Sequence, residues 1–182
     1  FDISLFYLKY NDRIGAIQKV DGYLIYRYRT NVSDSRNLGI ETFAELDVFR
    51  LFAGKDRKLG ISVFSNYSFI DARYINSSEP SVKSGNKVEY APEHILKTGV
   101  TASYKNFKAT FQYGYTSEQY TEATNTKFTS AAVDGLIPAY TIMDLSLSYS
   151  YKRLSIATGI NNLANNMYFT RRADGYPGPG II

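Results

Sequence analysis

The chain has 182 residues, which is enough for one domain and gives no reason to expect two. Apolar residues make up 44% and charged residues 21%, which excludes a disordered polar tail. Cysteine is absent, so disulfide frameworks and thiolate metal sites are excluded. The net charge of +4 comes from scattered basic residues rather than from one stripe, which argues against nucleic-acid binding.

Side-chain polarity alternates with a period of two along most of the chain. In the segment 107–116, Phe107, Phe111 and Tyr115 fall on one face of a strand and Lys108 and Gln112 on the other. This pattern predicts an all-β protein without a helix of usable length. The expected strands cover 2–15, 39–51, 59–74, 94–104, 107–120, 140–152 and 154–168, and the tyrosine-rich segment 23–32 is expected to be a hairpin arm leading into the second of them.

The expected connections alternate between short and long. Short turns lie at 54–57, 105–106 and 152–153, whereas long connections cover 75–93, 121–139 and the residues after 167. In an antiparallel meander this places all short turns at one end and all long loops at the other. Bacterial outer-membrane barrels have this asymmetry, and their strands need only about 9–11 residues each to span the bilayer.

Two other architectures fit the alternation. A soluble lipocalin-like barrel would turn its apolar side chains inward to a ligand cavity. A complete small outer-membrane barrel with an adhesive or structural role would keep them toward lipid. The polar face is rich in Ser, Thr, Gly and Asn with few long charged side chains, which is typical of a filled lumen and favours a membrane barrel over the soluble one.

Several motifs resemble the TonB-dependent receptors. The segment 29–41 resembles an N-x-G-x-x-x-x-x-G-x-E segment late in their barrels, with Ser33 where the family often has Gly. Gly159-Ile-Asn-Asn-Leu163 followed by Tyr168 resembles their penultimate-strand signature, and the continuation 168–180 is similar to the ferric-dicitrate-type branch. Ala91-Pro-Glu-His94 is similar to the turn from which such receptors re-enter the membrane.

The resemblance implies a 22-stranded antiparallel transmembrane β-barrel plugged by an N-terminal domain. Residues 1–182 would be a C-terminal part of that barrel, without the plug, the TonB-contact region or the closing strand. The chain begins without Met and ends in a loop-like Gly-Pro-Gly-Ile-Ile, so both ends look cut, and the odd number of expected strands agrees with a partial barrel.

By the same resemblance, the protein would be a bacterial outer-membrane receptor for a ferric chelate of the citrate or siderophore type, energised through TonB. Its further partners would be outer-membrane lipid and lipopolysaccharide, and no cofactor is implied, because iron travels with the ligand.

Enzymatic chemistry has little support in the sequence. His94 is the only histidine, so two-histidine metal sites are excluded, and we expect it to be a boundary side chain with local hydrogen bonds. Glu41, Glu45 and Asp47 share one strand face, where a carboxylate pair or cation site is conceivable but lining of the lumen is expected. The protein is therefore expected not to be an enzyme.

The last loop contains the candidate ligand-binding residues. Arg171 and Arg172 suit the carboxylates of an anionic chelate, and Tyr168 and Tyr176 offer flat contacts. Alternatively, the two arginines pair with Asp174 or with lipopolysaccharide, and the residues favour this alternative. The asparagines of Gly159–Leu163 are expected to be structural.

Overall fold

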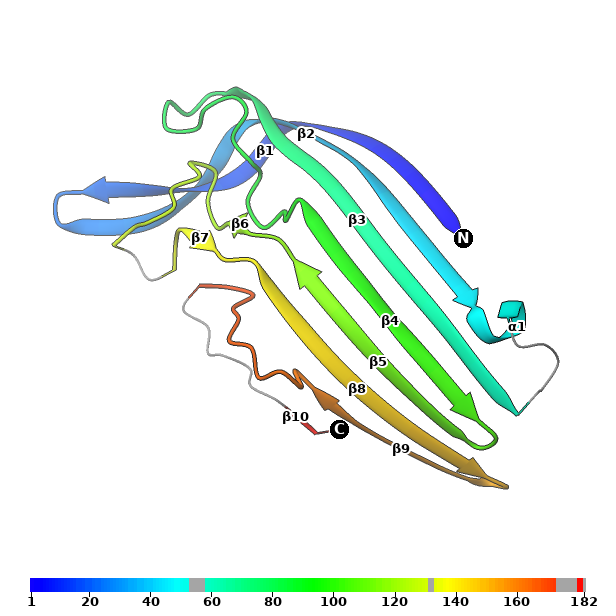
Figure 1. Ribbon diagram of the computed structural model, residues 1–182. Coiled ribbons are helices and arrows are strands. Elements are labelled where there is room, and N and C mark those ends of the chain that lie inside the picture. Colours follow the sequence, from blue (N-terminus) through cyan, green and yellow to red (C-terminus); the bar gives the residue numbers. More distant parts are fainter. Residues whose placement is uncertain (53–57, 131–132, 173–179, 182) are drawn as a thin grey trace.

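The computed structural model describes residues 1–52, 58–130, 133–172 and 180–181, which form one curved antiparallel sheet (Figure 1). Its strand order is β1-β2-β3-β4-β5-β8-β9-β10, and β6 pairs only with β7 in a small separate sheet. The strands are β1 (Asp2–Asp21), β2 (Leu24–Asp47), β3 (Leu59–Ser77), β4 (His94–Tyr104), β5 (Phe107–Thr116), β6 (Gln119–Tyr120), β7 (Leu136–Ile137), β8 (Tyr140–Tyr151), β9 (Leu154–Asn161) and β10 (Gly180–Ile181), and the one described helix is α1 (Val48–Phe52). None of the helical residues described forms a helix long and apolar enough to cross a membrane.

The seven expected strands are confirmed, and several of their limits are corrected. The expected arm 23–32 is the first part of a continuous β2, so β1 and β2 form one long hairpin that projects beyond the rest of the sheet (Figure 1). The second strand ends at Asp47 rather than at 51, because the Asp47 carboxylate accepts a hydrogen bond from the backbone N–H of Arg50 (3.0 Å) and thereby caps α1. The expected turn 54–57 lies outside the described residues.

The later strands are shorter than the alternation predicts. The fifth strand stops at Thr116, and residues 119–120 pair in the small β6–β7 sheet instead. The seventh stops at Asn161, because Asn162 has a φ of 51° and leaves the extended conformation. Gly180 and Ile181, expected to lie in a loop, pair with β9 as β10, so the count of strands in the sheet is not odd.

Cross-strand register aligns the apolar side chains into rows on one face. One row runs Val63, Val100, Phe111, Leu145 and Ile160 through five successive strands. Val100 and Phe111 remain 42% and 39% exposed, so this face is not covered by the described chain. An apolar surface that crosses a whole sheet requires an apolar surrounding, as the membrane-barrel interpretation predicts.

The opposite face is polar and small. The neighbouring row contains Ser62, Thr101, Thr110, Ser146 and Gly159. Within it, the hydroxyl oxygens of Thr101 and Thr110 lie 3.1 Å apart in a hydrogen bond. Glu41 and Glu45 lie on this polar face, opposite Ser68 and Phe64, in agreement with their expected lumenal position.

The only cluster of buried apolar side chains described lies at the loop end of the sheet. It contains Ile17, Val32, Ala72, Tyr74, Val82, Val88 and Ala123. Gly15 permits this packing, since a Cβ there would lie 2.6 Å from Val32 Cγ2 and 2.7 Å from the Tyr74 hydroxyl. The cluster fixes the β1–β2 hairpin and the loops 78–93 and 117–139 against one another.

The two faces predict opposite responses to a new charge. If the apolar face meets lipid, Leu145→Arg should destabilise the folded barrel by about 2–4 kcal/mol, because a guanidinium near the bilayer midplane loses its hydration. Ser146→Arg, one residue along on the polar face, should cost much less. To measure both costs, the full-length protein is folded into lipid vesicles and titrated with urea. The folded fraction of each variant is read from its heat-modifiable band on a gel. Equal costs for the two variants would contradict the assignment of faces.

Candidate functional site

Four arginines surround a hollow of about 500 Å³ at the loop end of the sheet. Arg27 and Arg29 come from the projecting part of β2, whereas Arg171 and Arg172 come from the segment after β9. The remaining lining residues are Ala16, Glu89, Tyr90 and Val133. The hollow therefore unites the first hairpin, two long loops and the last described loop segment, which are far apart in the sequence.

The arginines of β2 share one side of the strand because they are two residues apart. The Arg27 guanidinium donates to the Thr121 carbonyl and lies 3.7 Å from an Asp134 carboxylate oxygen, and it also lies over the Tyr90 ring. Arg29 is exposed and has no ion-pair partner among the described residues. Arg27 is thus held by the loop 117–139, while Arg29 is available to a ligand.

The structure brings together two of the five residues expected from the sequence. Arg171 and Arg172 line the hollow, and the Arg172 guanidinium donates to the Leu136 carbonyl (3.2 Å). Tyr168 is not among the lining residues; its ring stacks on Tyr140 with centroids 4.9 Å apart. Asp174 and Tyr176 lie outside the described residues, so pairing of the arginines with Asp174 stays a prediction.

Sequence reasoning missed Arg27 and Arg29. The signal was their spacing within a strand, combined with a position near the tip of a long hairpin. This signal was not sufficient, because the alternation alone gave no indication that the loop 117–139 packs against this hairpin. Glu89 and Tyr90 were missed for the same reason, since they lie in a long connection whose path no local pattern predicts.

Among the described residues that line the hollow, Glu89 is the one acid, and its carboxylate already has a hydrogen-bond partner. Its carboxylate accepts a hydrogen bond from the Tyr74 hydroxyl (2.6 Å). With four guanidinium groups and one carboxylate, the lining is strongly positive.

His94 confirms its expected role as a boundary residue. Its Nδ1 shares a 2.8 Å hydrogen bond with the Tyr67 hydroxyl, and its ring packs against Tyr67 and Phe69. The Ser117 hydroxyl accepts from the backbone N–H of His94, not from the imidazole (3.0 Å). The described residues contain no group of three or more His, Cys, Asp or Glu that could hold a metal ion.

Asn162, which directly follows β9, is structural, as expected. Asn162 is buried; its amide exchanges two 3.0 Å hydrogen bonds with the backbone of Asn166, and its own N–H donates to Asp144 (2.9 Å). The Asn166 amide in turn donates to the Thr141 hydroxyl (2.9 Å). These bonds close the turn that leads from β9 toward the hollow and place Arg171 and Arg172 there.

A family model for the β-barrel of TonB-dependent receptor-like proteins matches residues 1–163. The chain belongs to this family. Its members are receptors and transporters of the bacterial outer membrane, not enzymes. The antiparallel meander and its two faces are therefore those of a TonB-dependent receptor barrel.

Two solved structures share this fold. The unliganded ferric citrate transporter FecA matches with a TM-score of 0.78 and 22% identity, over 98% of this chain and 27% of that one. The ferric-catecholate import receptor Fiu from Escherichia coli K12 matches with a TM-score of 0.64 and 15% identity, over 98% of this chain and 24% of that one. The chain thus spans about a quarter of the length of these receptors.

The loop 117–139 contains a buried pair of acids, Glu122 and Asp134. Glu122 is 1% exposed, and neither of its carboxylate oxygens has a hydrogen-bond partner among the described residues. Burial raises the pKa of Glu122, and the nearby Asp134 carboxylate raises it further. The Glu122 carboxyl therefore holds its proton more tightly when the loop 117–139 is closed around it than when this loop is open.

This raised pKa predicts a pH-dependent loop. Local stability should be greatest at acid pH and should fall as pH rises from the ordinary value of 4.5 through the raised pKa, because ionisation then opposes the closed loop. Glu122→Gln should remove that fall. Hydrogen exchange of the amides of Thr121 and Ala123, which donate to Gly135 and Ala16, measures the effect.

The exposed neighbour Glu118 provides the matched control, since Glu118→Gln removes the same charge from a side chain that is not buried. A pH profile for Glu122→Gln that matches the wild-type profile would contradict the prediction.

Proposed function

We propose that this chain is part of an outer-membrane receptor that takes up a ferric chelate of the citrate or siderophore type, energised through TonB. Residues 1–182 form a C-terminal portion of its barrel, with the plug and the TonB-contact region outside it. The arginine-lined hollow is the observation that carries this proposal, because it supplies a positively charged ligand site at the loop end of the barrel.

The size of the hollow fits a small chelate. Ligand sites generally have volumes of about 300–1,000 Å³, and the hollow has about 500 Å³. Planar guanidinium groups bind carboxylates through two parallel hydrogen bonds, which gives both affinity and orientation. Arg29 and Arg171, which have no ion-pair partner among the described residues, are the first contacts for such a ligand.

The contacts of the residues that line the hollow indicate a separate role for each of them. Arg27 is tied to Thr121 and Asp134, so it joins the ligand site to the loop 117–139. Tyr90 offers a ring next to that guanidinium. The arginines contact the anionic outer atoms of the chelate, and iron remains enclosed by the chelator throughout as cargo.

Neutralising the free arginines tests the ligand class. Arg29→Gln or Arg171→Gln should raise the Kd for ferric citrate by roughly ten- to hundred-fold each, because a hydrogen bond between charged groups contributes about 1.5–3 kcal/mol. Equilibrium binding of radiolabelled ferric citrate to the purified full-length receptor measures this, and uptake by cells with and without the gene shows whether binding leads to transport.

Arg153→Gln is the matched control, since Arg153 is an exposed arginine in the short turn at the other end of the sheet. Loss of binding in this variant would indicate a general charge effect. Unchanged affinity in the Arg29→Gln, Arg171→Gln double variant would exclude the hollow as the ligand site. A wild-type receptor that binds a ferric catecholate but not ferric citrate would keep the site and change the ligand.

A further inference from the structure

Two carboxylates are buried in the loop 117–139 with few partners. Glu122 and Asp134 are 1% and 2% exposed, and neither carboxylate oxygen of Glu122 has a hydrogen-bond partner among the described residues. Oδ1 of Asp134 also lacks a hydrogen bond within the described part of the chain, although it lies 3.7 Å from the Arg27 guanidinium. Ionised carboxylates that are buried without partners are strongly unfavourable, so this pair requires a further binding partner.

One guanidinium serves both acids. Burial raises the pKa of Glu122 and the Asp134 charge raises it further, so the two carboxylates lie close enough to interact. Arg27 pairs with Asp134 and donates to the Thr121 carbonyl, and it forms no ion pair with Glu122. With both acids ionised, these three side chains have a net charge of −1. The missing partner is therefore positively charged.

Neutral oxygens adjoin the pair. The hydroxyls of Thr124 and Thr126 lie 3.0 Å apart in a hydrogen bond. Both hydroxyls counteract the rise in the pKa of Glu122, which places them near its carboxylate. The pair is smaller than the three-acid groups that are absent from the described residues, so neutral oxygens must complete any cation site. Calcium accepts such mixed sets, in which about six to eight carboxylate, neutral and water oxygens surround the ion.

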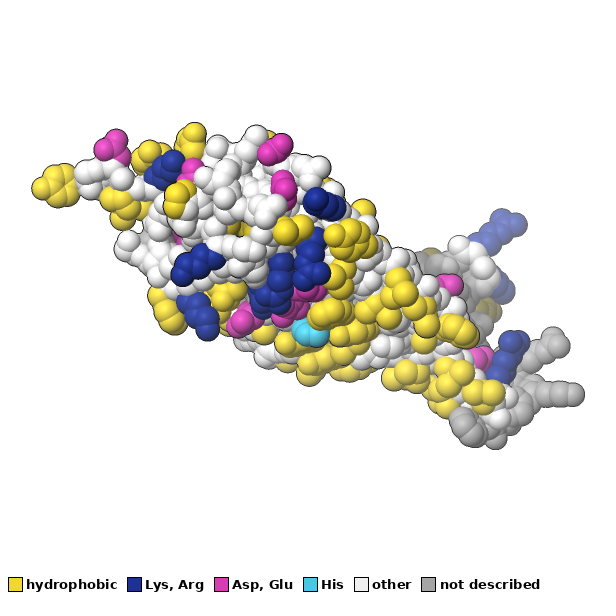
Figure 2. Space-filling view, turned by 90° about the horizontal axis from the view of Figure 1, so that it is seen from above, with side chains coloured by type: hydrophobic (Ala, Val, Ile, Leu, Met, Phe, Trp, Pro, Cys, Tyr) yellow, Lys and Arg dark blue, Asp and Glu magenta, His cyan; other side chains and the backbone are white. Residues whose placement is uncertain are grey.

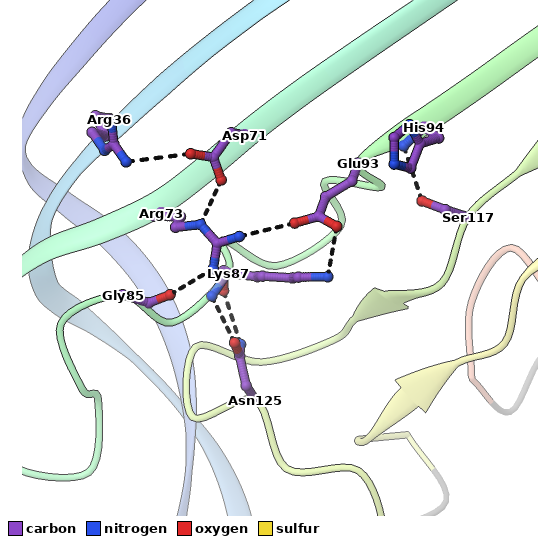
Figure 3. Close-up of polar contacts among 9 residues, drawn as sticks. All are labelled: Arg36, Asp71, Arg73, Gly85, Lys87, Glu93, His94, Ser117 and Asn125. Carbon is purple, nitrogen blue, oxygen red and sulfur yellow. Dashed lines mark hydrogen bonds and ion pairs between the residues drawn. The ribbon is translucent and has the colours of Figure 1, made fainter.

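The turn that contains these oxygens is fixed to the loop 78–93. The backbone N–H of Asn125 donates to the Glu122 carbonyl (3.2 Å). The Asn125 side-chain amide exchanges two hydrogen bonds with the backbone of Lys87 (2.6 and 2.8 Å; Figure 3). The Lys87 ammonium in turn pairs with Glu93 (3.0 Å). Because the turn is already ordered, binding an ion there costs little conformational entropy.

The surface of the molecule offers no competing acidic patch in the view from above. In Figure 2 the acidic side chains either stand singly or adjoin basic ones. Attraction of cations to this surface is therefore diffuse and is screened by salt, whereas charges inside the protein are screened much less. A cation consequently interacts most strongly with the buried pair.

We propose that Glu122 and Asp134 bind a calcium ion, which holds the loop 117–139 closed. The hydroxyls of Thr124 and Thr126 and water complete the ligand set. Neither acid lines the arginine hollow, so the ion site is separate from the proposed ligand site. The inference does not depend on the proposed function.

The charge and the irregular ligand set both favour calcium. Two positive charges match the two carboxylates, which leaves the charge of Arg27 for the hollow that it lines. Mg²⁺ fits less well, because it requires a nearly ideal octahedron and gives up its water reluctantly.

Hydrogen exchange of the full-length receptor, folded into vesicles of phosphatidylcholine, tests the site. This lipid has no net charge, so it does not compete for calcium as an anionic membrane would. Calcium sites of extracellular modules have Kd values of about 0.1–1 mM. At roughly 10 mM Ca²⁺, exchange of the Thr121 and Ala123 amides should therefore slow by about ten- to hundred-fold, compared with a chelator-treated sample at the same pH and ionic strength.

Glu122→Gln should abolish this slowing, because it removes one of the two charged ligands. Glu118→Gln is the matched control, since it removes an exposed carboxylate from the same loop, and it should respond to calcium as the wild type does. The amide of Asn165, which donates to Asn162 in the turn after β9, is the internal reference and should not respond. If Glu122→Gln does not fold, the wild type with Mg²⁺ in place of Ca²⁺ decides, because magnesium should leave exchange nearly unchanged.

The inference is wrong if wild-type exchange does not respond to Ca²⁺, if folded Glu122→Gln responds like the wild type, or if Mg²⁺ slows exchange equally. A response of Asn165 equal to that of Ala123 would also contradict it, because the ion would then act on the whole protein. No ferric chelate is present in these samples. Failure of the calcium site is therefore distinguishable from failure of the proposed receptor function, which chelate binding measures separately.

Discussion

The constraint on which the structure depends is the pairing of every backbone N–H and C=O in a lipid environment. In hydrocarbon an unpaired backbone group costs several kcal/mol, so each strand must have a partner on both sides. The long antiparallel ladder meets this demand for the strands between its two edges, from β2 to β8. Side chains then determine only what each face contacts. Because residues paired in register lie on the same face of the sheet, the apolar and polar rows continue from one strand to the next.

The same ladder separates two kinds of arginine site. Arg36 and Arg73 are paired in register on the apolar side of the sheet. Arg27 and Arg29 lie near the start of β2, where the hairpin projects beyond the sheet and contacts the loop 117–139. One strand thus carries basic groups for two environments, and its length alone decides which side chains face lipid and which line the hollow.

Local pattern predicted the strands that face lipid on one side and lumen on the other. His94–Tyr104 is found with its expected limits because turn residues bound it and one face is largely apolar. Pattern failed where tertiary contacts determine the path. Nothing local distinguishes residues 117–120, which leave the main sheet, from the strand before them. Likewise, the repulsion between Arg36 and Arg73 is visible only once register pairs them.

Loop order connects the ligand hollow to the buried acids. Thr121 accepts from Arg27 through its carbonyl, and its own hydroxyl and N–H both contact the Gly135 backbone. Glu122 and Asp134 flank this clasp, so a charge on Glu122 acts on the segment that holds Arg27. The Arg27 guanidinium lies 3.7 Å from Asp134, and the Asp134 carboxylate is one cause of the raised pKa of Glu122. If the proposed ligand anion binds Arg27, it competes with Asp134 for this cation, so that ligand binding favours protonation of the buried acids.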